Sequence, residues 1–331
     1  MPKTIQEDLL EKLQPTLAAV DATSEWRIGD PTVQARKCDI YKVANANRAL
    51  ALKVYKPNMV SSEAPSIQYH AMVRCNQAHQ RQSLLRAPTA LAFLPERCAI
   101  LMDWQTAHNL RSVLWNKFGS PRQRLDLITA AAKWLRVFHE MSGIERQQID
   151  GGPLTAKLHT QMSRRPEAMA LLEQDPAFQT ALNRFFGVAA ITCDNAPHAL
   201  LHGDFTPTNL LVDKAGVIGM DMWGARHGPV HEDIARMLAY LGVVSPFSLL
   251  PRPLTSSSAL IQAFARGYGE DLLDLRSVHL PMVLLYQQLR RWLVYTGKTN
   301  NQPFSPLAKW QLARNRSLCQ QTLAWLDHCI S

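Results

Sequence analysis

The residues best suited to chemistry in this 331-residue chain are the run His202-Gly203-Asp204, then Asn209 and Asp221. One carboxylate can orient an acceptor hydroxyl, while an amide oxygen and a second carboxylate can hold Mg²⁺ on nucleotide phosphates. Phosphoryl transfer requires these groups, because the protein contributes mainly positioning and charge stabilisation to that reaction. The residue types and their spacing therefore predict a phosphoryl-transfer site.

Short strands next to these residues support that interpretation. The apolar runs 210–212 and 217–220 predict a hairpin with its turn at 213–216, and the hairpin ends at Asp221. The alternative is that each polar residue is an ordinary cap or turn residue, since Asp and Asn favour such positions. The order of the residues, with apolar strands between them, favours the catalytic interpretation.

The ordered motif resembles the aminoglycoside phosphotransferase and choline kinase-like family, which has a protein-kinase-like fold. Members carry H-G-D-x-x-x-x-N, as at 202–209, with Gly where protein kinases carry Arg. An apolar strand ending in Asp follows, as at 217–221, and then D-x-A at a helix start, as at 233–235. The resemblance is strongest over 198–240 and extends over 26–300.

The resemblance implies a two-lobed α+β fold, with a small β-rich amino-terminal lobe and a larger, mainly helical carboxy-terminal lobe. We expect residues 1–104 to form the nucleotide-binding lobe with a leading helix. We expect residues 105–331 to contain the catalytic loop and the acceptor site.

The same resemblance implies roles for single residues. Asp204 is expected to be the catalytic base, assisted by Asn209, and Asn209 and Asp221 are expected to bind Mg²⁺. ATP or GTP is the expected donor, and Asp221 belongs to its site. Asp233 is expected to accept hydrogen bonds from the backbone of the catalytic loop, and His202 is expected to be structural.

A lysine on a strand is the expected phosphate-binding residue of the amino-terminal lobe. Strands are predicted at 36–43 and 48–55, with Leu50 and Leu52 of the second facing the core. Lys53 lies on the opposite face, where a buried ammonium needs a partner. The segment resembles the V-A-I-K strand of kinases, in which the lysine binds nucleotide phosphates. The alternative is an edge-strand lysine that extends to solvent.

The sequence leaves the partner of Lys53 open. A helix around 66–72 resembles the one that carries the lysine-binding glutamate in the family, but Gln68 stands at that position. Either Gln68 hydrogen-bonds the lysine without a charge, or Glu63 replaces the glutamate. The loop 30–36 contains no glycine, unlike the phosphate-covering loop of protein kinases, so no phosphate contact is assigned to it.

The segment 99–104 is predicted to be a strand that runs into a hinge. By resemblance, backbone groups around Met102 and Trp104 would hydrogen-bond the adenine base. The competing interpretation is an ordinary buried strand.

The carboxy-terminal half is predicted to be mainly helical, with helices at 122–141, 232–242, 256–268, 278–296 and 306–328. The helix predicted at 278–296 carries several aromatic and arginine side chains: Tyr286, Arg290, Arg291, Trp292 and Tyr295. They could bind an anionic or sugar-like acceptor, or they could form an aromatic core with a solvated arginine face.

The composition predicts a folded, cytoplasmic protein. Apolar residues make up 47% and charged residues 19%, a balance that disordered chains lack. No apolar stretch is long enough for a membrane helix, and the start, where Thr4 and Glu7 predict a helix-capping box, does not resemble a signal peptide. The six cysteines contain no C-x-x-C pair, which argues against structural zinc and against a disulfide framework.

The formal net charge of +9 bears on the partner. Such a charge can indicate a nucleic acid, an anionic membrane or an anionic substrate as partner, or only a solvated basic surface. No compact Lys/Arg block predicts a nucleic-acid arm. A polycationic aminoglycoside would suit so basic a protein only if acids cluster in the acceptor pocket. The expected partner is a small molecule with a hydroxyl group, whose identity fold analogy does not fix. A catalytically weak nucleotide-binding relative and a basic protein that binds nucleic acid or an anionic surface remain alternatives.

Overall fold

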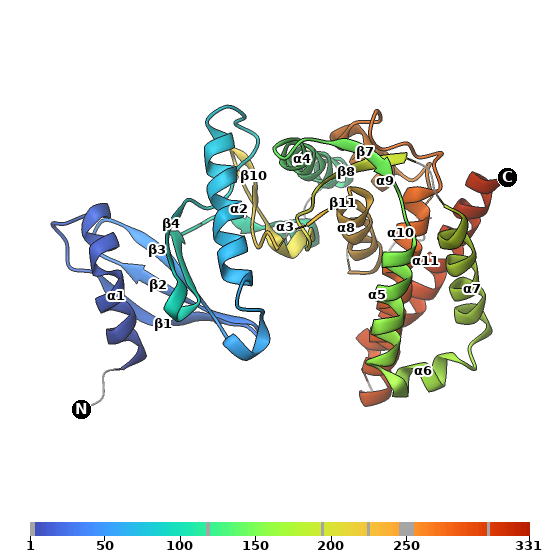
Figure 1. Cartoon of the computed structure of the whole chain (residues 1–331), viewed down its shortest axis with the longest axis horizontal. Helices are drawn as coiled ribbons and strands as arrows, with labels where there is room; N and C mark the ends of the chain where they lie inside the picture. The colour runs from blue at the N-terminus through green and yellow to red at the C-terminus, as the bar shows by residue number, and fades with distance from the viewer. Residues whose placement is uncertain (1–3, 117–119, 193–194, 224–225, 245–254, 303–304) are drawn as a thin grey trace.

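The computed structural model describes residues 4–116, 120–192, 195–223, 226–244, 255–302 and 305–331. These residues form a β-rich amino-terminal part and a mainly helical carboxy-terminal part (Figure 1). This arrangement confirms the predicted two-lobed α+β architecture. The boundary expected between residues 104 and 105 falls just after a strand of the amino-terminal sheet, and the division into two domains there stays a prediction.

A five-stranded antiparallel sheet in the order β1-β2-β3-β5-β4 forms the amino-terminal lobe. Its strands are β1 (Arg27–Gln34), β2 (Cys38–Ala44), β3 (Ala49–Tyr55), β4 (Ala90–Leu94) and β5 (Ala99–Asp103). Two helices flank it, α1 (Ile5–Val20) and α2 (Ala64–His79), and short 3-10 turns lie at Pro57–Met59 and Pro95–Arg97. The two strands predicted around Lys53 are therefore confirmed as β2 and β3.

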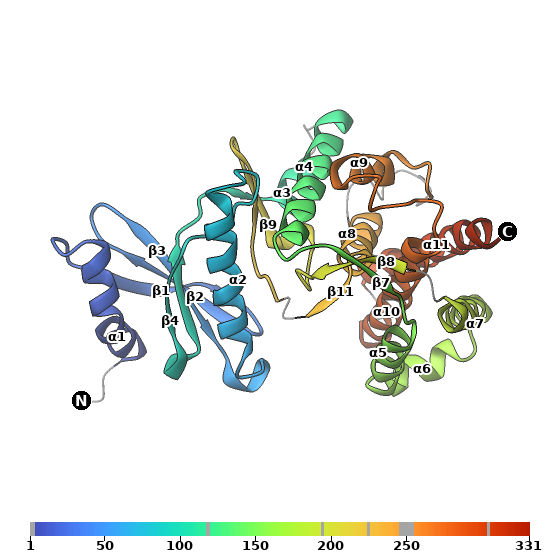
Figure 2. The ribbon, with the colours of Figure 1, turned by 45° about the horizontal axis from the view of Figure 1, so that its top comes forward.

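Helix α1 covers the outer face of this sheet (Figure 2). It begins with the predicted capping box, in which Thr4 and Glu7 exchange hydrogen bonds of 2.7 and 3.2 Å. Leu13 of α1 is buried in one cluster with Leu50 and Leu52 of β3, as expected for core-facing leucines.

The opposite face of the sheet is buried as well. Ala51 and Tyr55 of β3 cluster with Met72 and Cys75 of α2, and this cluster continues into the carboxy-terminal lobe. Lys53 lies between Ala51 and Tyr55 on that face, because side chains alternate along a strand. The lysine is therefore directed toward the junction of the two lobes and not toward a solvated sheet edge.

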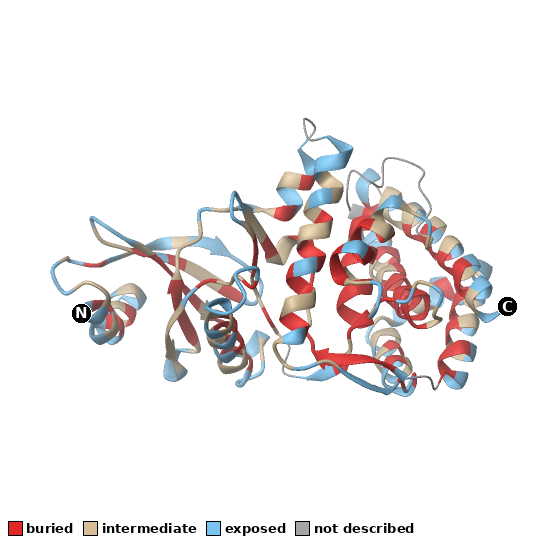
Figure 3. Ribbon diagram, turned by 90° about the horizontal axis from the view of Figure 1, so that it is seen from above, coloured by how far each residue is buried: buried red, intermediate tan, exposed pale blue. Residues whose placement is uncertain are grey.

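Helices dominate the carboxy-terminal lobe: α3 (Leu110–Trp115), α4 (Pro121–Glu140), α5 (Gly152–Ser163), α6 (Pro166–Leu172), α7 (Pro176–Ile191), α8 (His231–Val244), α9 (Ala259–Tyr268), α10 (His279–Asn301) and α11 (Pro306–Ile330). The five helices predicted there correspond to α4, α8, α9, α10 and α11. Helix α10 is buried along most of its length. Figure 3 shows buried residues, in red, on the inner sides of the helices of this lobe.

Two small antiparallel sheets complete this lobe. One has the order β10-β9-β6, with β6 (His108–Asn109), β9 (Leu210–Asp213) and β10 (Gly216–Gly219). The other has the order β11-β8-β7, with β7 (Glu145–Gln148), β8 (Asn195–Leu200) and β11 (His227–Pro229). The predicted hairpin is β9–β10. The chain between β8 and β9 contains the catalytic-loop motif and a 3-10 turn at Pro207–Asn209.

The hairpin is fixed against α4 by a close packing contact. A Cβ atom added at Gly219 would lie 2.1 Å from the ring of Trp134, so a side chain there would force the ring to move. The indole Nε1 of Trp134 and the amide of Gly219 both donate to the carbonyl oxygen of Arg86, each at 2.9 Å. These contacts set the position of Asp221, two residues further on.

His231, at the start of α8, gives a prediction for acid stability. Its ring is buried 5.5 Å from that of His279, and burial lowers the pKa of His231 to about 3. An unfolded histidine takes up its proton near pH 6.5, so the unfolded state binds more protons between pH 6.5 and 3, and stability falls as the pH drops through that window. In urea unfolding, this group should lower the free energy of unfolding by up to about 1.4 kcal/mol for each pH unit of acidification. The variant His231→Gln should lack this contribution. The exposed His328→Gln is the control; equal slopes for wild type and both variants would contradict the burial.

The described residues contain no helix that is both long and apolar enough to cross a membrane. Five cysteines are free thiols there, namely Cys38, Cys75, Cys98, Cys319 and Cys329. The sixth, Cys193, lies outside the described residues.

Candidate active site

The catalytic loop is built around a buried histidine. The ring of His202 packs against those of Trp134, Phe138 and Phe205, with centroids 5.5–5.9 Å away. Burial lowers the pKa of His202, although nearby carboxylates oppose the shift, so the ring is neutral at physiological pH. Its Nδ1 lies 3.4 Å from the amide of Asp204. These contacts agree with a structural role for His202.

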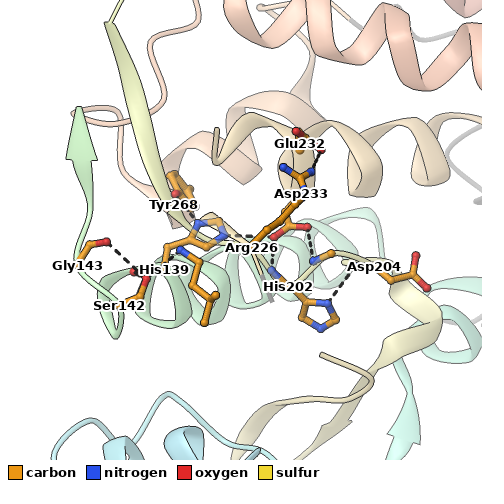
Figure 4. Close-up of polar contacts among 11 residues, drawn as sticks. His139, Ser142, Gly143, His202, Asp204, Arg226, Glu232, Asp233 and Tyr268 are labelled. Carbon is orange, nitrogen blue, oxygen red and sulfur yellow. Dashed lines mark hydrogen bonds and ion pairs between the residues drawn. The ribbon is translucent and has the colours of Figure 1, made fainter. Parts of the chain in front are cut away.

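Asp233 at the start of α8 holds the backbone of this loop (Figure 4). Its carboxylate accepts the amides of His202 at 2.6 Å and Gly203 at 2.9 Å, as the sequence predicts. Nε2 of His139, from the end of α4, lies 3.3 Å from the same carboxylate. Gly203 has a φ of 82°, a conformation that a residue without Cβ adopts most easily. The contacts of Asp233 therefore hold the backbone of the catalytic loop in one conformation.

The carboxylate of Asp204 is turned away from this clamp, and its side chain is 42% exposed. Its Oδ2 accepts a 2.9 Å hydrogen bond from the amide nitrogen of Asn209, which also donates to the carbonyl of Asp204. Its Oδ1 accepts a 2.9 Å bond from Arg236 of α8. An exposed carboxylate with both oxygens oriented could align an acceptor hydroxyl and take its proton.

Lys53 and Asp221 meet across the junction of the two lobes. The ammonium, whose side chain is 3% exposed, forms an ion pair with Oδ1 of Asp221. Burial alone would lower the pKa of Lys53, but the Asp221 carboxylate outweighs it and raises that pKa, while the lysine holds the pKa of Asp221 down. Both groups are therefore charged. The edge-strand alternative for Lys53 is wrong, because the side chain is buried and paired.

Gln68 completes this pair. Its Oε1 accepts a 3.1 Å hydrogen bond from Lys53, and its Nε2 donates a 3.1 Å bond to Oδ1 of Asp221. Glu63 is exposed at the start of α2 and does not replace it. The structure thus decides between the two partners that the sequence leaves open: Gln68 contacts the lysine without adding a charge.

The segment after β10 is attached to the catalytic loop at two points. The amide of Met220 donates to the carbonyl of Asn209 at 2.9 Å, and the amide of Trp223 donates to that of His202 at 2.9 Å. Asp221 lies between these bonds with a φ of 55°, in the left-handed region that costs energy for a residue other than glycine. The network holds Asp221 next to Asn209.

Asn209 and Asp221 carry oxygen atoms of the kind that Mg²⁺ binds, and their role as metal ligands stays a prediction. The side-chain nitrogen of Asn209 is occupied by Asp204, so its side-chain oxygen is the group left to bind a cation. Mg²⁺ prefers such oxygen ligands and commonly takes only one or two from the protein, with the rest from phosphates and water. The described residues contain no group of three or more His, Cys, Asp and Glu that could hold a metal by themselves.

The segment predicted as a hinge is the end of β5. Met102 is buried within the sheet, paired with Ala51 on β3 and Ala90 on β4. Trp104 follows the strand, and its ring lies 5.6 Å from the ammonium of Lys42. An adenine contact at Met102 and Trp104 stays a prediction.

A pocket of about 540 Å³ opens beside the catalytic loop, lined by Gly203, Asp233 and residues of α5, α8 and α10. Of the side chains singled out on α10, Tyr286 and Arg290 line it. Trp292 packs on Phe178 instead, with ring centroids 5.4 Å apart. Helix α10 thus contributes to both the pocket and the core, and acceptor binding by its side chains stays a prediction.

Several residues of this pocket are missing from the sequence-based prediction. Arg236 lies three residues after Asp233, hence on the same side of α8, and that spacing could have found it. Lys157 lies on α5 and Arg164 directly follows it, in a segment where no element is expected from the sequence. No local motif links them to the catalytic loop.

Comparisons with known proteins identify a matching family. Residues 39–280 match the model of a family described as "Phosphotransferase enzyme family". No curated protein matched the chain.

Solved structures share the fold at low sequence identity. A putative aminoglycoside phosphotransferase from Ralstonia eutropha JMP134 is 12% identical, with 95% of this chain and 98% of that chain covered and a TM-score of 0.56. A choline/ethanolamine kinase family protein from Mesorhizobium loti is 12% identical, with coverages of 96% and 99% and a TM-score of 0.55. A thermostable mutant of an aminoglycoside phosphotransferase, in ternary complex with ADP and hygromycin B, is 13% identical, with coverages of 96% and 99% and a TM-score of 0.57. These similarities confirm the protein-kinase-like fold and the resemblance found in the sequence.

Proposed function

Because this chain belongs to the phosphotransferase enzyme family, we propose that it transfers the γ-phosphoryl group of ATP to a hydroxyl of a small molecule. GTP is the alternative donor, Mg²⁺ the metal, and the cytoplasm the location. The observation that carries the proposal is the convergence of Lys53 from one lobe with Asp221 and Asn209 from the other, beside the exposed carboxylate of Asp204. The nucleotide complex of a protein with the same fold supports it.

Each residue has a role that its position permits. Lys53 would bind the α- and β-phosphates, with Gln68 orienting its ammonium. Asn209 and Asp221 would hold Mg²⁺, which when bound neutralises charge on the phosphates during transfer. Asp204, oriented by Asn209, would align the acceptor hydroxyl and accept its proton as the new O–P bond forms. Backbone groups near Met102 and Trp104 would bind the adenine.

The metal role of Asp221 can be tested separately from catalysis. Asp221→Asn removes the anionic Mg²⁺ ligand while keeping the side-chain size. We expect the affinity for Mg²⁺-bound AMP-PNP to fall at least about 10-fold, because charge-assisted contacts contribute roughly 1.5–3 kcal/mol. Binding measured without Mg²⁺ should change much less. The matched control is Asp327→Asn, which alters an exposed ion pair with Arg184. Equal Mg²⁺ dependence in wild type and the Asp221 variant would remove the residue from the metal site.

A catalytically weak nucleotide-binding relative is the second candidate. The observation that favours it is Gln68, which stands where the family resemblance predicts a glutamate and gives Lys53 a neutral partner. Such a protein would bind Mg²⁺-nucleotide normally yet show no phosphoryl transfer to any acceptor. Turnover with an acceptor distinguishes the two candidates.

A further inference from the structure

The pocket beside the catalytic loop is strongly cationic. Five basic side chains line it, from α5, α8, α10 and the segment before β11: Lys157, Arg164, Arg226, Arg236 and Arg290. Among the lining residues that the structure describes, the only carboxylates are Glu232 and Asp233. Basic side chains therefore outnumber carboxylates in the lining of this pocket.

Both carboxylates are already committed to other groups. Glu232 pairs with Arg226 and lies 3.4 Å from Lys157, so it balances charge at one side of the pocket only. Asp233 is buried and binds the loop amides and His139. Neither carboxylate is free to receive a cationic ligand.

Arg236 is neutralised as well, since it pairs with Asp204 outside the pocket lining. The two arginines that remain have no carboxylate partner within the described ranges: Arg164 at the end of α5 and Arg290 in the middle of α10. Helix α5 runs beside α10 in Figures 1 and 2 and packs against it, which brings the two guanidinium groups to one pocket.

Arg290 is the more constrained of the two. Its guanidinium lies 5.6 Å from the ring centre of Tyr286, and NH1 donates to Gln287 at 3.0 Å, but its buried Nε has no hydrogen-bond partner among the described residues. Burial, together with the other arginines nearby, lowers the pKa of Arg290. A buried cation with an unused donor is costly unless an anion completes its surroundings.

We propose that the acceptor of this enzyme carries an anionic group, a phosphate or a carboxylate, that binds Arg290 and Arg164 while its hydroxyl reaches Asp204. The inference rests on the proposed phosphotransferase function and names its substrate class. Guanidinium groups bind such oxyanions with two parallel hydrogen bonds, which fix orientation as well as charge. Polycationic or quaternary-ammonium acceptors would be repelled by the same surface.

The test compares four six-carbon compounds that differ in charge: glucose, glucose 6-phosphate, gluconate and glucosamine. Binding to the full-length protein is followed by the melting temperature with Mg²⁺-AMP-PNP saturating, so that the nucleotide site is occupied. Inorganic phosphate and acetate are included as probes that do not depend on sugar shape. We expect stabilisation by the anionic compounds to exceed that by glucose, and glucosamine to be the weakest. Comparing the phosphate compounds with the carboxylate compounds identifies the preferred anion.

Two charge-matched variants locate the anion. Arg290→Gln should weaken binding of the preferred anion by about 10- to 100-fold, the range for a hydrogen bond to a charged group. Arg184→Gln removes one positive charge from an exposed ion pair outside the pocket and should leave the affinity for this anion unchanged. Raised salt should weaken anion binding in the wild type.

The outcomes separate the two claims. If Mg²⁺-AMP-PNP fails to bind, the proposed function is wrong. Binding of the anionic compounds is then measured on the nucleotide-free protein. If neither inorganic phosphate nor acetate nor any anionic sugar shows Arg290-dependent binding, the inference is wrong. Tighter binding of glucosamine than of glucose 6-phosphate and gluconate would also overturn it.

Discussion

Asp204→Asn should reduce kcat by at least about three orders of magnitude, the upper range for loss of a general base. The amide has the same shape but cannot accept the proton of the attacking hydroxyl. Because the Asp204 side chain is 42% exposed and its ion pair with Arg236 lies near the surface, the fold should tolerate the change. Rates are measured as ADP release with the best acceptor among the four compounds that differ in charge.

Binding of Mg²⁺-AMP-PNP to the same variant provides the control. It should stay within a few-fold of wild type, since the groups proposed to bind nucleotide are Lys53, Asn209 and Asp221. A variant that retains near-normal turnover would show that Asp204 is not the base. Loss of both nucleotide binding and turnover would instead point to a damaged loop.

Asp233→Ala should destabilise the protein by about 3–5 kcal/mol, the effect of removing one partner from a buried charged network. The amides of His202 and Gly203 would lose their acceptor in a site where the Asp233 side chain is 1% exposed. Urea unfolding measures the loss, with Asp327→Asn as an exposed control expected to change stability by less than about 1 kcal/mol. A change below about 1 kcal/mol for Asp233→Ala would contradict the clamp.

Much of this site could be predicted because its parts are local in sequence. The alternation of β3 indicates the face on which Lys53 lies, and the turn signals at 213–216 place Asp221 at the end of a hairpin. In these two cases a short segment determines its own conformation, so pattern and propensity are enough. The clamp by Asp233 joins residues about 30 positions apart, and its prediction rests on the family resemblance.

Contacts between distant segments could not be predicted in this way. Gln68 and Glu63 are both near the start of one helix, and only the packing of α2 against the sheet shows that Gln68 contacts Lys53. Arg164 and Arg290 are far apart in sequence and meet because α5 packs on α10. The outer face of β3 is covered by α1, an interaction that depends on tertiary packing.

The central claim is that this chain binds a Mg²⁺-nucleotide between its lobes. Its most direct test is the melting temperature with ATP and with GTP, each with and without Mg²⁺. Ligand at 100 times its Kd stabilises the folded state by about 2.7 kcal/mol, which is several degrees for a domain of ordinary size. The proposed function predicts a Mg²⁺-dependent rise with at least one nucleotide, which also identifies the donor. No rise with either nucleotide in the presence of Mg²⁺ would contradict it.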